Sequence, residues 1–159
     1  MKNSYEKVVK NLKTFDEQLN FVLTQSYGLI SNIEQSTLMK SKRFKLSLNE
    51  LKLLYVVSCH SDGLTMTQLA EHLFITPSSV TIAVKCLEKK GYCLRERAKD
   101  DARRVFIRLT KEGEHAARIH RRFHRNFANV ISKDLTEVEK AALIKCINNM
   151  NQFVIERWR

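Results

Sequence analysis

The sequence is poor in residues that turn a chain and in paired cysteines. It holds one proline and four glycines in 159 residues, too few for a protein made of many short strands joined by tight turns. Its four cysteines contain no C-x-x-C pair, which argues against a zinc or disulfide framework. We therefore expect a mainly helical chain with reduced thiols, buried within the apolar patterns around Cys59, Cys86, Cys93 and Cys146.

Two further absences limit the function. No apolar run approaches the roughly 18 to 20 residues that span a bilayer, and the amino end lacks the short apolar core of a secretory signal. We therefore expect a cytoplasmic protein with no membrane partner. No phosphate-cradling glycine loop and no nucleophile with acid–base partners occurs either. The sequence favours a protein that is not an enzyme and has no obligatory cofactor.

Positive charge is abundant. The chain has 28 lysines and arginines against 17 acidic residues, a formal net charge of +11. Fourteen of the 28 basic residues, but only six acidic ones, lie between residues 85 and 125. Such a concentrated positive field attracts polyanions, so double-stranded DNA is the first candidate partner.

Apolar residues three or four positions apart predict helices over most of the chain. The opening segment, from Tyr5 to Leu38, carries a wide apolar face, and we expect its helix to break near Gly28. Helical periodicity returns near Gly113 and runs towards the carboxyl end. Hydroxyl residues that can cap a helix N-terminus precede four of the expected helices: Ser47, Thr65, Thr76 and Thr136.

Two of these helices are short and adjacent, joined near residues 74–75, which predicts a helix-turn-helix. After Gly91 the pattern changes to alternation around residues 92–94 and 105–109. The charged residues 95–104 separate these two stretches. This pattern predicts a β-hairpin with a charged tip beside the helix-turn-helix.

Several stretches then match one family in the right order. They are Leu69-Ala70-Glu71-His72-Leu73, Thr76-Pro77-Ser78-Ser79-Val80-Thr81, Leu87-Glu88-Lys89-Lys90-Gly91-Tyr92, Asp101-Ala102-Arg103 and Ile107-Arg108-Leu109-Thr110-Lys111-Glu112-Gly113. Over about residues 30–150 the chain resembles the MarR-type winged helix-turn-helix transcriptional regulators. The resemblance implies a mainly α fold with a small β-hairpin wing, in a homodimer formed through the N- and C-terminal helices.

We accordingly expect one domain over residues 1–159. Residues 1–38 and 113–159 would form the helical dimerisation region, and residues 47–112 the winged helix-turn-helix DNA-binding lobe. An inward apolar stripe of Val80, Val84 and Leu87 would leave the other faces of its helix for DNA. The expected DNA-binding residues are Thr76, Ser78, Ser79, Thr81, Ile82, Lys85, Lys99, Asp101, Arg103 and Arg104.

These residues have different expected roles. Asp101 would hold Arg103 for insertion into a minor groove, while Lys99 and Arg104 neutralise phosphates. The hydroxyls can bond phosphates or base edges. Ile82 departs from the family, which commonly has a longer polar or basic residue there, although an aliphatic side chain can meet a thymine methyl.

The segment from His115 to Arg125 resembles the branch of the family that represses fatty-acid-biosynthesis genes. The co-repressor implied is a long-chain acyl group on acyl carrier protein, whose acidic surface could dock on the arginines of this segment. The candidate ligand-binding residues are Arg118, His120, Arg121, Phe123 and His124.

The sequence also leaves other functions open. His120 and His124 lie one helical turn apart and could share a zinc ion, which would make the chain a zinc-responsive regulator. The chain could also be a basic helical module that binds a protein or membrane surface. An oxidation sensor is less favoured, because the family's peroxide sensors place the reactive thiol on the opening helix, which has no cysteine here.

Overall fold

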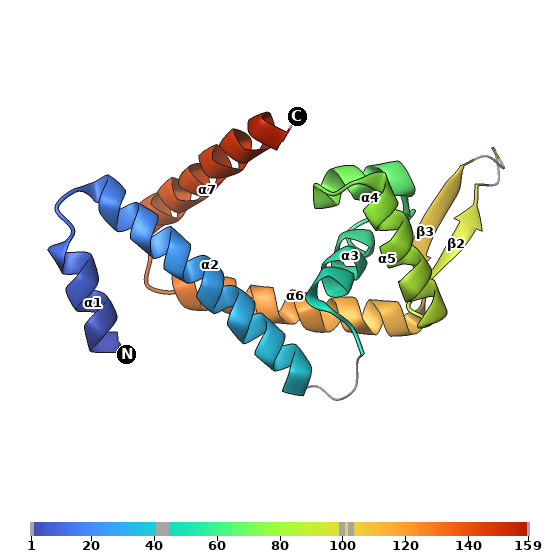
Figure 1. Ribbon diagram of the computed structural model, residues 1–159, viewed down its shortest axis with the longest axis horizontal. Coiled ribbons are helices and arrows are strands. Elements are labelled where there is room, and N and C mark those ends of the chain that lie inside the picture. The colour runs from blue at the N-terminus through green and yellow to red at the C-terminus, as the bar shows by residue number, and fades with distance from the viewer. Residues whose placement is uncertain (1, 41–44, 99–100, 102–103, 159) are drawn as a thin grey trace. The chain divides into compact units, whose positions relative to one another are not determined.

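The computed structural model describes residues 2–40, 45–98, 101 and 104–158, with side chains placed for 7–36, 45–98, 101 and 104–157. Its internal contacts divide the chain into two compact units, residues 1–48 and residues 49–159. Figure 1 shows the elements of each unit. None of the helices within the described ranges is long and apolar enough to cross a membrane.

The first unit consists of two helices, α1 (Lys2–Asn11) and α2 (Phe15–Lys40). The break between them differs from our expectation. It lies at residues 12–14, where the Thr14 hydroxyl accepts a hydrogen bond from the amide of Glu17, and the Glu17 carboxylate accepts from the amide of Thr14. This reciprocal cap starts a new helix, whereas Gly28 lies within α2 without interrupting it.

The second unit combines helices with a small sheet, which confirms the expected winged helix-turn-helix fold. Its elements are α3 (Leu48–Ser58), β1 (Leu64–Thr65), α4 (Met66–Leu73), α5 (Pro77–Lys89), β2 (Cys93–Arg97), β3 (Val105–Leu109), α6 (Lys111–Ser132) and α7 (Glu137–Trp158).

The core of this unit lies between the helix-turn-helix and the sheet. Its largest fully buried side chains come from α3, α4, α5 and β3, and they are Leu51, Leu53, Leu54, Leu69, Val80, Val84, Leu87 and Ile107. Burying a leucine or valine side chain contributes about 1.5–3 kcal/mol. One continuous core therefore holds the second helix of the helix-turn-helix against the hairpin.

The sheet has three strands in the order β1-β3-β2, all antiparallel. The hairpin of β2 and β3 was expected, but β1 was not. Leu64 pairs with Ile107 in a strand of two residues, too short to show alternation in the sequence. Gly63 permits the approach, because its φ is +78° and a Cβ there would lie 2.6 Å from the carbonyl oxygen of Ile107.

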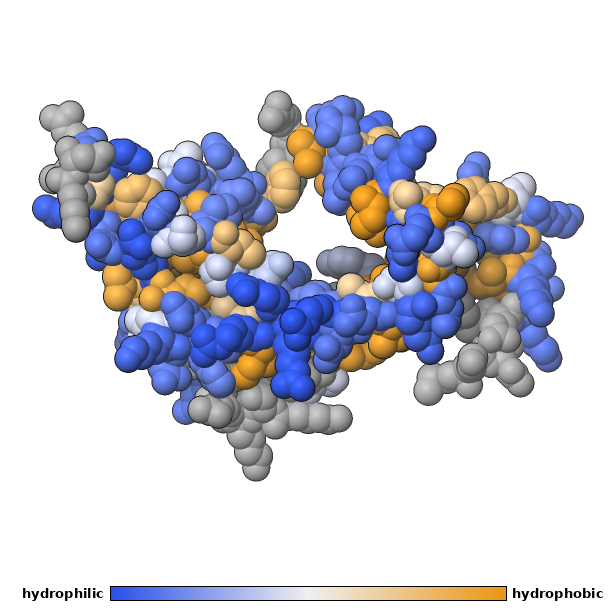
Figure 2. All heavy atoms as spheres, turned by 180° about the vertical axis from the view of Figure 1, so that it is seen from behind, coloured by the Kyte–Doolittle hydropathy of each residue, from blue (hydrophilic) through white to orange (hydrophobic). Residues whose placement is uncertain are grey.

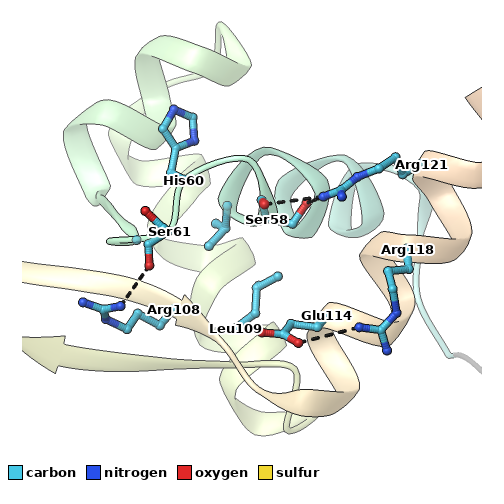
Figure 3. Close-up of a pocket in the computed structure, with 10 residues that line it drawn as sticks. Ser58, His60, Ser61, Arg108, Leu109, Glu114, Arg118 and Arg121 are labelled. Carbon is cyan, nitrogen blue, oxygen red and sulfur yellow. Dashed lines mark hydrogen bonds and ion pairs between the residues drawn. The ribbon is translucent and has the colours of Figure 1, made fainter. Parts of the chain in front are cut away.

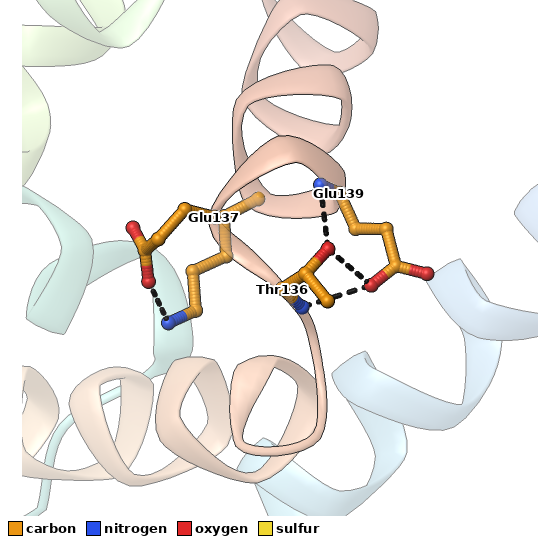
Figure 4. A network of polar contacts seen from close by, with 4 residues as sticks. Thr136, Glu137 and Glu139 are labelled. Carbon is orange, nitrogen blue, oxygen red and sulfur yellow. Dashed lines mark hydrogen bonds and ion pairs between the residues drawn. The ribbon is translucent and has the colours of Figure 1, made fainter.

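Capping residues fix where α6 and α7 begin. Thr110 caps α6, accepting from the amide of Gly113 at 3.1 Å and donating to the carbonyl of Gly91 at 2.7 Å. At α7, the Thr136 hydroxyl accepts from the amide of Glu139, and the Glu139 carboxylate accepts from the amide of Thr136 (Figure 4). The hydrogen bonds that the Thr136 amide and hydroxyl donate to the Glu139 carboxylate lower the pKa of Glu139. The cap expected at Thr136 is confirmed.

The last helix, α7, buries none of its described residues in the single chain. Figure 2 shows hydrophobic side chains along its surface, and the large exposed ones are Val138, Ile144, Ile147, Met150, Phe153 and Val154. A contiguous apolar face left in water is typical of an interaction surface.

Candidate nucleic-acid interface

The helix-turn-helix is formed by α4 and α5. Thr65 and Gln68 close the expected capping box at the start of α4. Phe74 ends α4 in the left-handed region, with φ of 52° and ψ of 43°, so the chain leaves the axis of α4 and enters α5 after three residues. Thr76 then caps α5, accepting from the amide of Ser79, and Pro77 occupies its first turn, where the missing amide hydrogen removes no hydrogen bond.

The two faces of α5 differ as the sequence predicts. Val80, Val84 and Leu87 are 0% exposed and lie on one side of the helix, as a rotation of about 100° per residue requires. The opposite side carries Ser78, Ile82 and Lys85, with Ser79 and the half-buried Thr81 at its two edges. Of these, Ile82 is 71% exposed and Ser78, Ser79 and Lys85 are exposed. The structure thus gathers five expected DNA-binding residues on one surface; that they bind DNA stays a prediction.

The hydroxyls on this surface bond one another and the backbone. The Thr76 Oγ1 atom lies 2.9 Å from Ser78 Oγ and 2.8 Å from Ser79 Oγ. Thr81 Oγ1 donates to the carbonyl of Pro77 at 2.9 Å. Thr76 therefore acts first as a helix cap, and the hydroxyl cluster is held in place before any ligand arrives.

The wing continues beyond the paired strands. Arg97 pairs with Val105, and the amide of Ala98 donates to the carbonyl of Arg104 at 2.9 Å. The amide of Arg104 donates to the carbonyl of Asp101 at 3.0 Å. The Arg104 guanidinium lies 5.2 Å from the centre of the Phe106 ring. Lys99 and Arg103 lie outside the described residues, so the expected pairing of Asp101 with Arg103 stays a prediction.

Two contacts fasten the wing to α5, and no sequence pattern pointed to either. Arg95 of β2 forms an ion pair with Glu88 of α5, with Nε and Oε2 separated by 3.1 Å. The buried Cys93 thiol donates to the carbonyl of Val84 across 3.8 Å. Burial raises the pKa of the Cys93 thiol to about 12, so this thiol stays protonated at neutral pH.

A second ion pair fixes the far end of α5. The Lys90 ammonium lies 2.7 Å and 2.9 Å from the two carboxylate oxygens of Glu50 in the first turn of α3. Glu50 is 8% exposed. Its hydrogen bond raises the pKa of Lys90, which keeps the ammonium charged and joins α3 to the end of α5.

The candidate ligand-binding residues separate into two groups. Arg118 and Arg121 line a pocket of about 330 Å³ between the end of α3, β3 and the start of α6 (Figure 3). Arg121 donates to Ser58 Oγ at 2.8 Å, and Arg108 of β3 donates to the carbonyl of Ser61 at 3.0 Å. Glu114 pairs with Arg118 at 3.7 Å. The lining is largely polar and has an excess of cations, so it suits an anionic group rather than an acyl chain.

The other group is a row of aromatic rings. His120 is 5% exposed, and its ring lies 5.2 Å from that of Tyr55 on α3 and 4.5 Å from that of His124. Phe123 meets the His124 ring edge-on at 5.3 Å. His120, Phe123 and His124 therefore lie on a different face of α6 from the pocket arginines. Arg108 belongs to a stretch that matches the family, but no sequence pattern placed Arg108, Ser58 or Ser61 in this pocket, because alternation does not tell which helix covers a strand.

The expectation that all four cysteines are buried is wrong. Cys93 is buried and Cys86 half-buried, but Cys59 and Cys146 are exposed. Cys59 follows the last turn of α3, where the apolar pattern ends. Cys146 lies on α7, whose apolar face is not covered within the single chain. All four thiols are free.

With this geometry in place, relatives can be compared. The family model of the SarA/Rot transcriptional regulators matches residues 35–118. The organic hydroperoxide resistance transcriptional regulator of Bacillus subtilis is 28% identical over 79 residues, which cover 46% of the chain and 54% of that protein. The Hpr regulator of Geobacillus thermodenitrificans is 30% identical over 89 residues, or 56% of the chain and 44% of that protein. The chain thus spans about half the length of the curated relatives it matches.

Solved structures extend the likeness to most of the chain. FabT of Streptococcus pneumoniae, solved in complex with DNA, is 31% identical with a TM-score of 0.79, covering 88% of this chain and 97% of that one. The MepR–DNA complex of S. aureus, at 19% identity and a TM-score of 0.70, covers 89% and 98% and shares the fold. The family comprises transcriptional regulators and not enzymes. The chain belongs to the MarR/SarA family of DNA-binding winged helix-turn-helix transcriptional regulators.

Proposed function

We propose that this chain is a homodimeric repressor of fatty-acid-biosynthesis genes, with acyl carrier protein bearing a long acyl chain as its co-repressor. The observation that carries the proposal is the similarity to FabT, which extends over 88% of the chain at 31% identity. The DNA-binding surface of α5 and the wing would contact the operator. Bound there, the dimer would block RNA polymerase.

The dimer is supported by the apolar face of α7. A single winged helix offers few base contacts, so useful specificity needs two copies about 34 Å apart along the duplex. Phe153 and Val154 are each 55% exposed and Val138 is 79% exposed, and a second copy of the same helix could cover them in a two-fold interface. The expected operator is therefore a palindrome with one α5 in each of two successive major grooves.

The acyl-carrier co-repressor is supported by the charges of α6. Arg118 and Arg121 line the polar pocket with Arg108, and Arg122 and Arg125 are exposed on the same helix. Charge-assisted hydrogen bonds from guanidinium groups favour carboxylates, which an acidic carrier protein supplies. The acyl chain itself needs an apolar cavity, which this pocket does not offer, so the place of the chain is the less supported part of the proposal.

One observation favours a second candidate. The rings of His120 and His124 lie 4.5 Å apart, close enough for both imidazoles to reach one zinc ion. A zinc-responsive regulator would use this pair instead of the arginines. The two candidates therefore depend on different faces of α6.

Operator selection tests these proposals. The purified protein selects duplexes from a random pool under four conditions. It is tested without additions, with acyl carrier protein carrying long acyl chains, with the unacylated carrier as control, and with zinc. Palindromes enriched only with the acylated carrier support the co-repressor. Enrichment only with zinc overturns it in favour of the metal. Weak binding that is equal for all duplexes contradicts the regulator and favours a basic module for protein or membrane surfaces.

A further inference from the structure

Ile82 is an unusual residue for the centre of a DNA-binding surface. It lies on α5 one turn after Ser78 and one turn before Lys85, on the face opposite the buried stripe. Its side chain is 71% exposed, more than any other large apolar residue between α3 and β3. Val80 and Val84 on the other side of α5 are 0% exposed, so the core anchors the helix that carries Ile82.

The polar neighbours of Ile82 are already engaged. Ser78 and Ser79 bond the Thr76 hydroxyl, and Thr81 donates to the Pro77 carbonyl. To donate to a base edge, the Thr81 hydroxyl would have to give up its bond within the helix. Ile82 would lose no hydrogen bond on binding DNA, because its side chain makes only apolar contacts.

The major groove offers one strongly apolar group, the C5-methyl of thymine. Isoleucine has one strongly preferred rotamer in a helix, so its contact with that methyl loses little side-chain entropy. We propose that Ile82 makes this regulator select a thymine in each half-site by packing against its methyl group. This inference rests on the proposed function, in that it requires α5 to enter the major groove.

The expected size of the thymine preference follows from the burial of one methyl group. Removing one methyl group from water changes an equilibrium constant by about fourfold. Two symmetric half-sites would give about fifteenfold in total, since distant contacts add. A preference of this size is measurable, and it is smaller than the discrimination that a bidentate hydrogen bond provides.

The test replaces thymine by deoxyuridine, which keeps every hydrogen bond and lacks only the methyl group. Each thymine of a selected operator half-site is replaced in turn, and the dissociation constant is measured for the wild-type protein, Ile82→Ser and Lys85→Ala. At one position the wild type should bind thymine about four times more tightly than deoxyuridine. Ile82→Ser should bind both equally, whereas Lys85→Ala should bind both more weakly and keep the fourfold ratio.

The possible outcomes distinguish the role proposed for Ile82 from the proposed function as a DNA-binding regulator. If the protein binds its operator specifically, but no thymine shows a ratio that Ile82→Ser abolishes, the role of Ile82 is wrong and the regulator stands. If the protein shows no preference among duplexes, both proposals fail. Circular dichroism checks that Ile82→Ser is folded, which is expected because the side chain is exposed.

Discussion

Lys90 and Glu50 form a bidentate contact, 2.7 Å and 2.9 Å long, between residues 40 positions apart in the sequence. The Glu50 side chain is 11% exposed and that of Lys90 33%. The contact therefore lies between a surface ion pair and a buried one. It ties the end of α5 to α3, so its loss should lower the free energy of unfolding of the unit that holds both helices.

We expect Glu50→Gln to lower the free energy of unfolding by about 1–2 kcal/mol, measured by urea denaturation. The exposed pair of Lys140 and Glu137 supplies the control, and Glu137→Gln should change stability by less than about 0.5 kcal/mol. The contact raises the pKa of Lys90 above its ordinary 10.5. Its contribution should thus be undiminished from neutral pH to about pH 10.5 and vanish as the pH rises through the folded-state pKa of Lys90. Equal effects of the two substitutions would contradict this.

Gly113 should tolerate no side chain, although it lies in a helix. A Cβ at this position would overlap the carbonyl oxygen of Tyr92, which belongs to the backbone and cannot turn aside. We expect Gly113→Ala to destabilise the protein by more than about 2 kcal/mol. A Cβ at Gly28 in α2 would meet no neighbouring atom within 4 Å, so Gly28→Ala should stabilise by about 0.5–1 kcal/mol. Thermal denaturation should therefore show a lower melting temperature for Gly113→Ala and a higher one for Gly28→Ala than for the wild type.

Charges placed on α7 should dissociate the dimer without unfolding the chain. Ile147 and Phe153 are 39% and 55% exposed, so the fold of one chain does not depend on burying them. The double variant Ile147→Asp with Phe153→Asp should sediment as a monomer and lose roughly tenfold or more in operator affinity. Gln152→Glu, at an exposed position on the polar side of the same helix beside Glu156, is the matched control and should remain a dimer. A dimeric double variant would place the interface elsewhere.

The wing arginine gives a further test of DNA binding. If Arg103 enters a minor groove, Arg103→Ala should weaken binding most at operators whose flanks are rich in A·T pairs, where the groove is narrow. It should also lower the slope of log affinity against log salt by about one unit, because one cation fewer displaces counterions from the duplex. Lys140→Ala on α7 should leave both unchanged. An equal loss at all flanking sequences would assign Arg103 to a phosphate instead.

The thiols should react in the order of their exposure. A maleimide or disulfide reagent should modify Cys59 within the folded protein. Cys93 should react only on unfolding, because burial raises its pKa to about 12 and leaves almost no thiolate at about pH 8. Above about pH 9 the same burial should lower stability, since the unfolded thiol ionises first. Mass spectrometry of peptides identifies the labelled residue, with Cys59→Ser as control; rapid labelling of Cys93 would contradict its placement.

Local signals predicted most of the fold. Thr65, Thr76 and Thr136 start helices where the sequence placed them, because capping depends on residues only three positions apart. The zero exposure of Val80, Val84 and Leu87 likewise follows from helical spacing. These features require no knowledge of what packs against them.

The missed features depend on distant partners. The two-residue strand β1 forms because it pairs with β3. Glu50 contacts Lys90 because α3 packs beside the end of α5. The helix break fell at Thr14 rather than Gly28 because a reciprocal cap gains hydrogen bonds, whereas one glycine costs a helix only about 1 kcal/mol. Cys146 was expected to be buried because an apolar pattern cannot tell a core from an interface.

The ion pair of Arg95 with Glu88 and the bond from Cys93 to Val84 join α5 to the paired part of the wing at two points. A duplex would thus meet two contact elements whose mutual angle is already set. Little motion has to be frozen when the complex forms, and more of the contact energy is retained as affinity. A signal that weakens binding would then act by displacing each lobe as a whole.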